Sequence, residues 1–185
     1  MGSEMCIRDS FEINDIKIYL SQIKVTKISY EEADKLLSEN KLLSKLNEIA
    51  KEHKSSRERN GAIRLNLPKT DIKLLDQKVI VIPQPESESR EMISEFMVLA
   101  GRVVAKFSIE NNISMPYLLQ DSGKFSDEII ENINNLSLSK TFEAAKGFNR
   151  SKLSVKPSLH AGLGLNKYLR AVSYTHLTLP TILLV

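Results

Sequence analysis

The stretch from Ser89 to about Ile109 constrains the fold most, because it has the pattern of one long amphipathic helix. Its apolar residues recur every three or four positions and form one broad arc, which is typical of a helix with a buried face. They are Met92, Ile93, Phe96, Met97, Ala100, Val103, Val104 and Phe107. The preceding run PESESRE, at 85–91, supplies a break and an N-terminal cap. The rest of the chain is expected to pack around this helix.

The segment before this helix contains three further elements. Residues 15–20 alternate between apolar and polar, which is typical of a strand with one buried face. Ser29–Glu32 reads S-Y-E-E, a capping-box pattern, and it predicts a helix that continues through Leu37. A second helix is predicted over Leu42–His53, where leucine, isoleucine and alanine recur at helical spacing.

Three short alternating runs follow Gly61, and they predict an antiparallel meander. The runs are AIRLNL (62–67), IKLLD (72–76) and VIVIP (79–83). Beyond the long helix, two weaker helices are predicted at 127–134 and 141–148. No internal repeat and no long linker divides the chain. The predicted fold is therefore α+β, with mixed helices and a mainly antiparallel sheet in one domain.

Both ends of the chain have the signature of foreign DNA. Met5–Ser10 can be encoded by a string whose reverse complement encodes Val172–His176, and Thr178–Thr181 continues the same adapter of transposase-made sequencing libraries. Such scars are excluded from fold reasoning. We therefore expect residues 1–10 and 171–185 to be adapter-derived, and residues 11–170 to be a partial domain.

The composition excludes several classes of function. With 26 Lys and Arg against 23 Asp and Glu, the net charge is +3, which is compatible with a nucleic-acid partner but is not evidence for one. The only cysteine, Cys6, falls in the expected adapter, so no disulfide or thiolate chemistry is predicted. The closing apolar run is too short to span a membrane. No phosphate loop, H-E-x-x-H, nucleophile elbow or magnesium-holding aspartate cluster occurs.

Glu95 is the most informative candidate, because it falls at the flank of the apolar arc, close to Arg102. Its carboxylate could be half-buried and aimed into a cleft, or it could pair with Arg102 at the surface. The residue pattern alone favours the surface pair, since glutamate is rarely buried without a partner.

Three other side chains have a structural explanation as their default. His53 sits among lysines and glutamates, which indicates a solvated helix position. His160 lies in a glycine-rich loop, where a structural hydrogen bond is expected, and Tyr30 opens the capped helix. Neither histidine has an orienting partner in the sequence, so neither is predicted to be catalytic.

Four motifs in order resemble the ribonuclease II/ribonuclease R family, in the latter part of its catalytic domain. They are KVTKISYEEADKLL (24–37), RERNGAIRLNLP (57–68), MISEFMVLAGRVVAKF (92–107) and RSKLSVKPSLHAGLGLNKYLR (150–170). The resemblance covers nearly all of residues 11–170. Within the family, the motifs are most similar to those of the branch found in cyanobacteria and plastids. Gly101 departs from it, because the family often has asparagine there, and this predicts a looser helix.

The resemblance implies a hydrolytic, Mg²⁺-dependent 3′→5′ exoribonuclease that degrades single-stranded RNA to nucleoside 5′-monophosphates. In the family the metal-binding aspartates lie upstream of the position of Phe11, and an arginine signature follows the position of Arg170. The chain itself is therefore expected to be inactive, with no catalytic or metal-binding residue of its own. Tyr30 and Glu95 match family positions near the terminal sugars and are the expected substrate-binding residues. A carboxylate that accepts from a 2′-hydroxyl favours RNA over DNA.

A catalytically inactive RNA-binding homologue is the alternative, and the upstream aspartates would distinguish the two. A plain helical interaction module would require the four ordered motifs to be a coincidence. The resemblance further implies a cytoplasmic or plastid enzyme with single-stranded RNA as its partner, and no membrane or protein partner is expected.

Overall fold

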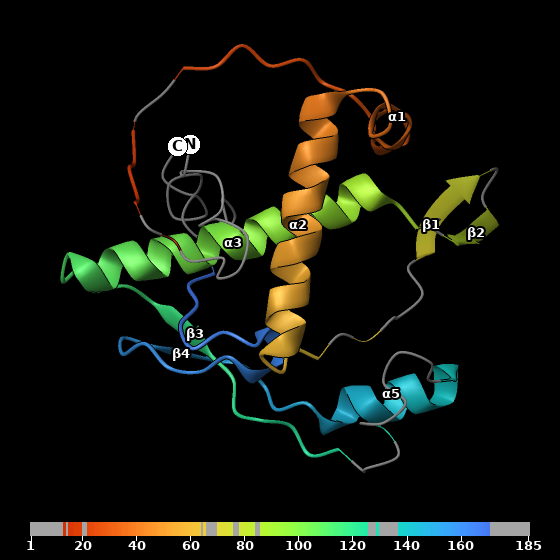
Figure 1. Ribbon diagram of the computed structural model, residues 1–185. Helices are drawn as coiled ribbons and strands as arrows, with labels where there is room; N and C mark the ends of the chain where they lie inside the picture. Colours follow the sequence, from red (N-terminus) through yellow and green to blue (C-terminus); the bar gives the residue numbers. More distant parts are fainter. Residues whose placement is uncertain are drawn as a thin grey trace, which may run out of the picture.

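The computed structural model describes residues 13, 15–19, 22–63, 65, 70–75, 78–83, 86–125, 129 and 137–170. The elements in order are α1 (Tyr30–Leu36), α2 (Lys41–Arg59), β1 (Thr70–Leu75), β2 (Lys78–Pro83), α3 (Glu88–Glu110), β3 (Tyr117–Leu119), α5 (Leu138–Gly147), β4 (Lys152–Ser154) and the 3₁₀ turn η1 (Ala161–Leu163). The expected α+β class is confirmed (Figure 1). The predicted adapter segments, and the predicted helix at 127–134 apart from Ile129, lie outside the described residues.

Local capping explains where the first two helices begin. The predicted box at α1 is present, since the Glu32 amide donates to Ser29 Oγ at 3.2 Å and the Ser29 amide donates to Glu32 Oε2 at 2.8 Å. At α2, the Asn40 side chain accepts from the first free amides of the helix. This helix continues to Arg59, beyond the predicted end at His53, and Gly61 follows it with φ of +86°.

The long helix α3 agrees with its prediction to within a residue at each end, and Ser87 caps it. Its buried face coincides with only part of the apolar arc: Met92 is buried, but Ile93 and Met97 are 43% and 58% exposed. The buried positions are Ser89, Met92, Glu95, Gly101, Ala105 and Ser108. The difference arises because α3 packs against two different neighbours along its length. Helix α2 crosses its first half (Figure 1), and the 168–169 segment lies against its second half.

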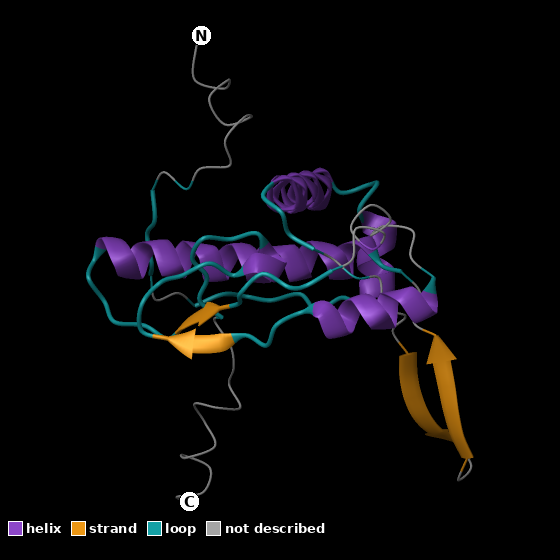
Figure 2. Cartoon of the chain, turned by 90° about the horizontal axis from the view of Figure 1, so that it is seen from below, coloured by secondary structure: helices purple, strands orange, loops and turns teal. Residues whose placement is uncertain are grey.

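Two of the three predicted strands form a hairpin. β1 and β2 are antiparallel, with Thr70 opposite Pro83 and Leu75 opposite Lys78. The described residues of the first run, 62, 63 and 65, form no strand. The prediction of a strand at 15–20 was wrong for its described part, because residues 15–19 pair with no neighbour and Ile18 is 61% exposed. The hairpin projects away from the remaining elements (Figure 2).

The second sheet and the small core lie under the C-terminal half of α3. β3 and β4 are antiparallel, with Tyr117 opposite Ser154. Tyr117 packs with Ala105 and Leu169 in the core, and its hydroxyl lies 2.9 Å from Ser108 Oγ. Because a buried hydroxyl needs a partner, this bond allows a tyrosine in the core. Within the described part of the chain, no helix is long and apolar enough to cross a membrane.

Candidate nucleic-acid interface

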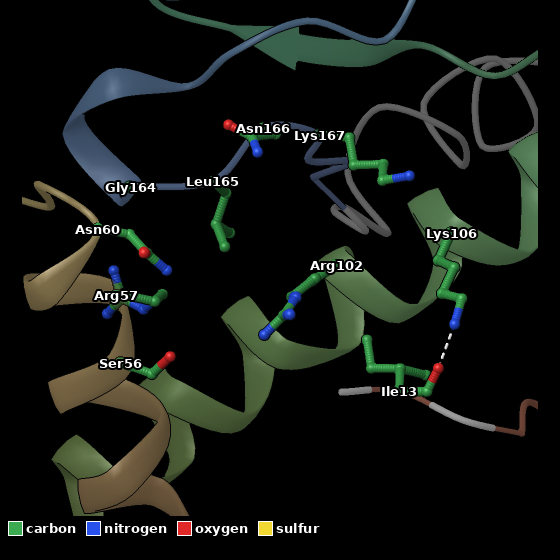
Figure 3. Close-up of a pocket in the computed structure, with 10 residues that line it drawn as sticks. All are labelled: Ile13, Ser56, Arg57, Asn60, Arg102, Lys106, Gly164, Leu165, Asn166 and Lys167. Atoms are coloured by element: carbon green, nitrogen blue, oxygen red, sulfur yellow. Dashed lines mark hydrogen bonds between the residues drawn. The ribbon is translucent and has the colours of Figure 1, made fainter. Parts of the chain in front are cut away.

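A basic cleft of about 650 Å³ opens where the end of α2, the middle of α3 and the 164–167 segment meet (Figure 3). Four cationic side chains line it, and no carboxylate is among its described lining residues. The lining residues are Ile13, Ser56, Arg57, Asn60, Arg102, Lys106, Gly164, Leu165, Asn166 and Lys167. Hydroxyl and amide groups separate the charges. Such a combination suits a polyanion that also carries hydrogen-bonding sugars.

Two of the four cleft cations lie on α3, one turn apart, and therefore share a face of the helix. Arg102 and Lys106 are separated by four residues, and both line the cleft. Lys106 Nζ also donates to the carbonyl of Ile13, and it lies 3.5 Å from the Glu110 carboxylate. Lys167 enters from the opposite wall, on the segment that follows η1 (Figure 3).

Arg57 differs from the other three cations because it is almost fully buried and belongs to an ion pair. Its Nε donates to Glu95 Oε2 at 3.2 Å, and its Nη2 donates to Glu95 Oε1. His53 Nδ1 lies 3.2 Å from the same Oε2, and as a carboxylate only accepts, this ring nitrogen must be the donor. His53 is 1% exposed and Glu95 is 6% exposed.

These contacts correct two sequence-based interpretations. His53 was expected at a solvated position, but it faces α3 in the interior. Glu95 was expected to pair with Arg102 at the surface, but it is buried and pairs with Arg57 instead. The reason is that α2 crosses α3 on the side of Glu95, which the arc of apolar residues did not mark.

The ionisation of Glu95 follows from these partners. Burial raises the pKa of the Glu95 carboxyl, but hydrogen bonds from His53 and Arg57 and the charge of the guanidinium outweigh it. The pKa of Glu95 therefore lies below its ordinary value, and the side chain is a carboxylate at neutral pH. A buried carboxylate of this kind needs its partners, since an uncompensated charge is costly to bury.

Two more ion pairs join the same helices further from the cleft. Lys51 Nζ lies 2.8 Å from Glu88, and Lys54 Nζ lies 2.7 Å from Glu91. The side chains of Lys51 and Glu88 are about 60% exposed. Those of Lys54 and Glu91 are 28% and 36% exposed, and those of Arg57 and Glu95 are 10% and 8% exposed. The pairs thus become more buried toward the cleft.

The wall opposite α3 is a tight turn at 160–165. Gly164 has φ of +62°, and a Cβ there would lie 2.5 Å from the Arg57 carbonyl oxygen and 2.8 Å from the Ala62 amide. Only glycine satisfies both the backbone conformation and this close approach. The guanidinium of the same Arg57 donates through Nη1 to the Leu163 carbonyl at 3.2 Å. The end of α2 and the turn are therefore held together at two points.

Tyr30, the other expected substrate-binding residue, lies elsewhere in the fold. It is the first residue of α1 and is 40% exposed, and the Arg90 guanidinium sits 4.7 Å above its ring. Its carbonyl accepts from Ser89 Oγ. Neither Tyr30 nor Glu95 is among the residues that line the cleft; Glu95 lies behind it, bound to the lining residue Arg57.

His160 is buried and its imidazole lies edge-on to the Tyr168 ring, with centroids 5.6 Å apart. Its backbone pairs with both Gln120 and Leu165, which closes the turn. Burial lowers the pKa of His160, and in the described part of the chain its Nδ1 has no hydrogen-bond partner. The expected structural bonds are thus made by the backbone of His160.

Sequence reasoning did not single out the four cleft cations, although a signal for them existed. All four lie in motifs that resemble the ribonuclease family. Arg57 is in the second motif, Arg102 and Lys106 are in the third, and Lys167 is in the fourth. Those three motifs meet at the cleft, whereas the first motif forms α1.

A comparison with family profiles tests the resemblance that the four motifs indicated. The family profile described as the RNB domain matches residues 1–182. The chain belongs to the RNB domain family. This confirms the assignment made from the four motifs.

Named relatives of the RNB domain chain are ribonucleases. An uncharacterized ribonuclease of Synechocystis is 32% identical over 169 residues, which cover 87% of this chain and 25% of that protein. Ribonuclease R of Chlamydia pneumoniae is 28% identical over 122 residues, which cover 61% of this chain and 18% of that protein. The chain spans a quarter or less of the length of these relatives.

Solved structures share the fold of the RNB domain chain. Ribonuclease R of Mycoplasma genitalium, in complex with ribose-methylated single-stranded RNA, superposes with a TM-score of 0.62 at 18% identity over 83% of this chain and 33% of that one. An active-site mutant of the Dss1 exoribonuclease of Candida glabrata gives 0.65 at 21% identity over 77% of this chain and 21% of that one. At these identities the comparison supports the fold alone.

Proposed function

We propose that this chain belongs to an exoribonuclease and that the basic cleft holds the phosphate–sugar backbone of single-stranded RNA. The observation that carries the proposal is the convergence of Arg57, Arg102, Lys106 and Lys167 on one cleft in an RNB domain. Phosphate contacts supply most of the sequence-independent affinity for nucleic acid. The hydroxyl of Ser56 and the amides of Asn60 and Asn166 offer partners for 2′-hydroxyls at the same place.

The reaction that we propose for the whole enzyme is 3′→5′ hydrolysis that releases nucleoside 5′-monophosphates with Mg²⁺. Among the described residues, no group of three or more His, Cys, Asp or Glu could hold a metal ion, so these residues do not fit a magnesium site. The part that we assign to this chain is to bind and orient the RNA. We accordingly propose that the 185-residue chain binds RNA and does not hydrolyse it alone.

The two sugar-contacting residues implied by the family resemblance remain a proposal as well. For Glu95, Oε2 already accepts from Arg57 Nε and His53 Nδ1, while among the described residues Oε1 accepts only from Arg57 Nη2. A carboxylate oxygen has two lone pairs, so Oε1 retains one for a 2′-hydroxyl. Tyr30 keeps its ring near the surface, where it could stack on a base.

A binding titration tests the proposal. The purified chain is titrated with a fluorescent single-stranded RNA oligonucleotide and with the matched DNA oligonucleotide at several salt concentrations. We expect RNA to bind more tightly, with log K falling against log salt at a slope of about −2 to −3, as for three or four phosphate contacts at about 0.7 each. A chain that binds no RNA at low salt contradicts the assignment of the cleft.

Incubation of the same chain with RNA and Mg²⁺ tests the second part. No mononucleotide is expected above a mock purification. Release of nucleoside 5′-monophosphates would show that the chain carries its own catalytic centre. In the full-length parent, the same assay separates an active exoribonuclease from an RNA-binding homologue that has lost catalysis.

A further inference from the structure

We propose that Arg57, held by Glu95, is a positioning residue that fixes the 160–165 turn and so places Lys167 at the cleft. The expected effect on RNA affinity rests on the proposed RNA-binding function, whereas the role of Arg57 in fixing the turn does not. It assigns to Arg57 a role beyond that of one more positive charge among the lining residues.

The first observation is that the guanidinium of Arg57 is already engaged by protein groups from two directions. Nε and Nη2 are bound to Glu95, and Nη1 is bound to the carbonyl of Leu163. Because the guanidinium is planar and rigid, fixing one edge on Glu95 also fixes the direction of Nη1. Glu95 therefore orients the donor that reaches the turn.

The second observation is that the turn has few other ties to α2 or α3. Its amides bond within the turn or to Gln120: those of Ala161 and Gly162 reach the Gln120 carbonyl and side-chain oxygens at 2.9 and 3.1 Å. Gly164 only touches the end of α2. The Arg57–Leu163 bond is thus a side-chain hydrogen bond that ties α2 directly to this turn.

The third observation is that Lys167 follows the turn directly. Leu165, which is buried, closes the turn through two backbone bonds with His160, and Asn166 and Lys167 come next as exposed cleft residues. On their other side, Tyr168 and Leu169 are bonded to Leu118 and Gly101, so a displaced turn would shift Asn166 and Lys167 from the side of the turn alone. Arg57 is therefore expected to change the affinity for RNA through the position of Lys167 more than through its own, mostly buried, charge.

The test compares Arg57→Lys with Arg57→Gln and with a matched control, Lys54→Gln. Arg57→Lys keeps the charge but loses the fork that joins Glu95 to Leu163. Lys54→Gln removes a cation and an α2–α3 ion pair one turn away, without touching the turn. The first readout needs no RNA: amide hydrogen exchange at residues 160–165, all of whose amides are hydrogen-bonded.

We expect both Arg57 variants to speed exchange at 160–165 by about tenfold, while the amides of α5 keep their wild-type rates and Lys54→Gln has no effect. Exchange that stays at the wild-type rate in Arg57→Lys overturns the proposal. Acceleration that is equal in α5 also overturns it, because the role of Arg57 would then be general stability.

The second readout is a double-mutant cycle on the affinity for the RNA oligonucleotide. If Arg57 acts through the turn, the double variant Arg57→Lys with Lys167→Gln loses clearly less affinity than the product of the two single fold-losses. In the double variant Arg57→Lys with Lys106→Gln, the fold-loss in affinity equals that product. Multiplicative effects in both cycles mean that Arg57 acts by itself, which refutes the positioning role. If the wild-type chain binds no RNA, the proposed function fails, and the exchange measurement still decides the role of Arg57.

Discussion

The guanidinium of Arg57 and the carboxylate of Glu95 form a two-point ion pair inside the α2–α3 interface, with about a tenth of either side chain exposed. The two residues are 38 positions apart in the sequence, and their ion pair lies beside the basic cleft. It joins the packing of two helices to the geometry of a proposed binding surface.

Replacing Glu95 by glutamine should destabilise the chain strongly. Removing one partner of a buried ion pair leaves Arg57 uncompensated, and this lowers the free energy of unfolding by about 3–5 kcal/mol. Urea midpoints at neutral pH measure the change. Glu91→Gln, which breaks the more exposed pair with Lys54 across the same interface, is the control and should lower it by about 1 kcal/mol or less. Equal effects would mean that the burial of Glu95 is not what matters.

Stability should fall in mild acid because of His160. Burial lowers its folded-state pKa, so the unfolded chain takes up the proton first as the pH falls below about 6.5. The contribution is complete above about pH 6.5 and is lost as the pH falls from there toward the folded pKa. Urea midpoints measured from about pH 8 to about pH 5 should decline less in His160→Gln than in the wild type. Parallel declines would show that His160 does not cause the loss.

Replacing Gly101 by alanine should destabilise α3 although alanine is the better helix former. A Cβ at this position would lie 2.3 Å from the Leu169 carbonyl oxygen and 2.5 Å from the Tyr168 ring. We expect a loss of about 1–3 kcal/mol in the free energy of unfolding, as in an overpacked core. The control, Ala100→Gly at the exposed neighbour, reports the propensity alone, about 0.5–1 kcal/mol. A stabilised Gly101→Ala would contradict the close approach of residues 168–169.

Neutralising single cleft cations should weaken RNA binding and flatten its salt dependence. Each of Lys106→Gln and Lys167→Gln is expected to reduce the magnitude of the salt slope by about 0.7, because one phosphate contact is lost. Fluorescence titrations across salt concentrations give the slopes. Lys45→Gln on the first turns of α2, which pairs with Glu48 and does not line the cleft, is the control and should leave the slope unchanged. Slopes that stay at the wild-type value in the cleft variants would place the RNA elsewhere.

The helices were the most predictable part of the fold. The capping box at Ser29 was found, Ser87 supplies the cap that was predicted within residues 85–91, and α3 ends within a residue of its predicted limit. Caps and apolar periodicity act over one or two turns, so they can be read without knowledge of distant contacts. The strand at 15–20 failed because alternation alone does not supply a neighbouring strand to pair with.

The candidate site was likewise predictable in part. The family assignment followed from four motifs in order, and three of these motifs carry the cleft cations. The burial of His53 and Glu95, and the choice of Arg57 over Arg102 as partner, could not be predicted. They depend on which side of α3 is crossed by α2, and the apolar arc of α3 does not mark that side.

The sequence by itself determined the main helices, their caps and the family, because these depend on neighbours along the chain and on the order of motifs. The tertiary structure decided which face of α3 is buried, why Gly101 must lack a side chain, and how Arg57 reaches Leu163 across 106 residues. The physical reason is that such contacts depend on the crossing of helices and on the direction of single donors. No local pattern of residues encodes either of these.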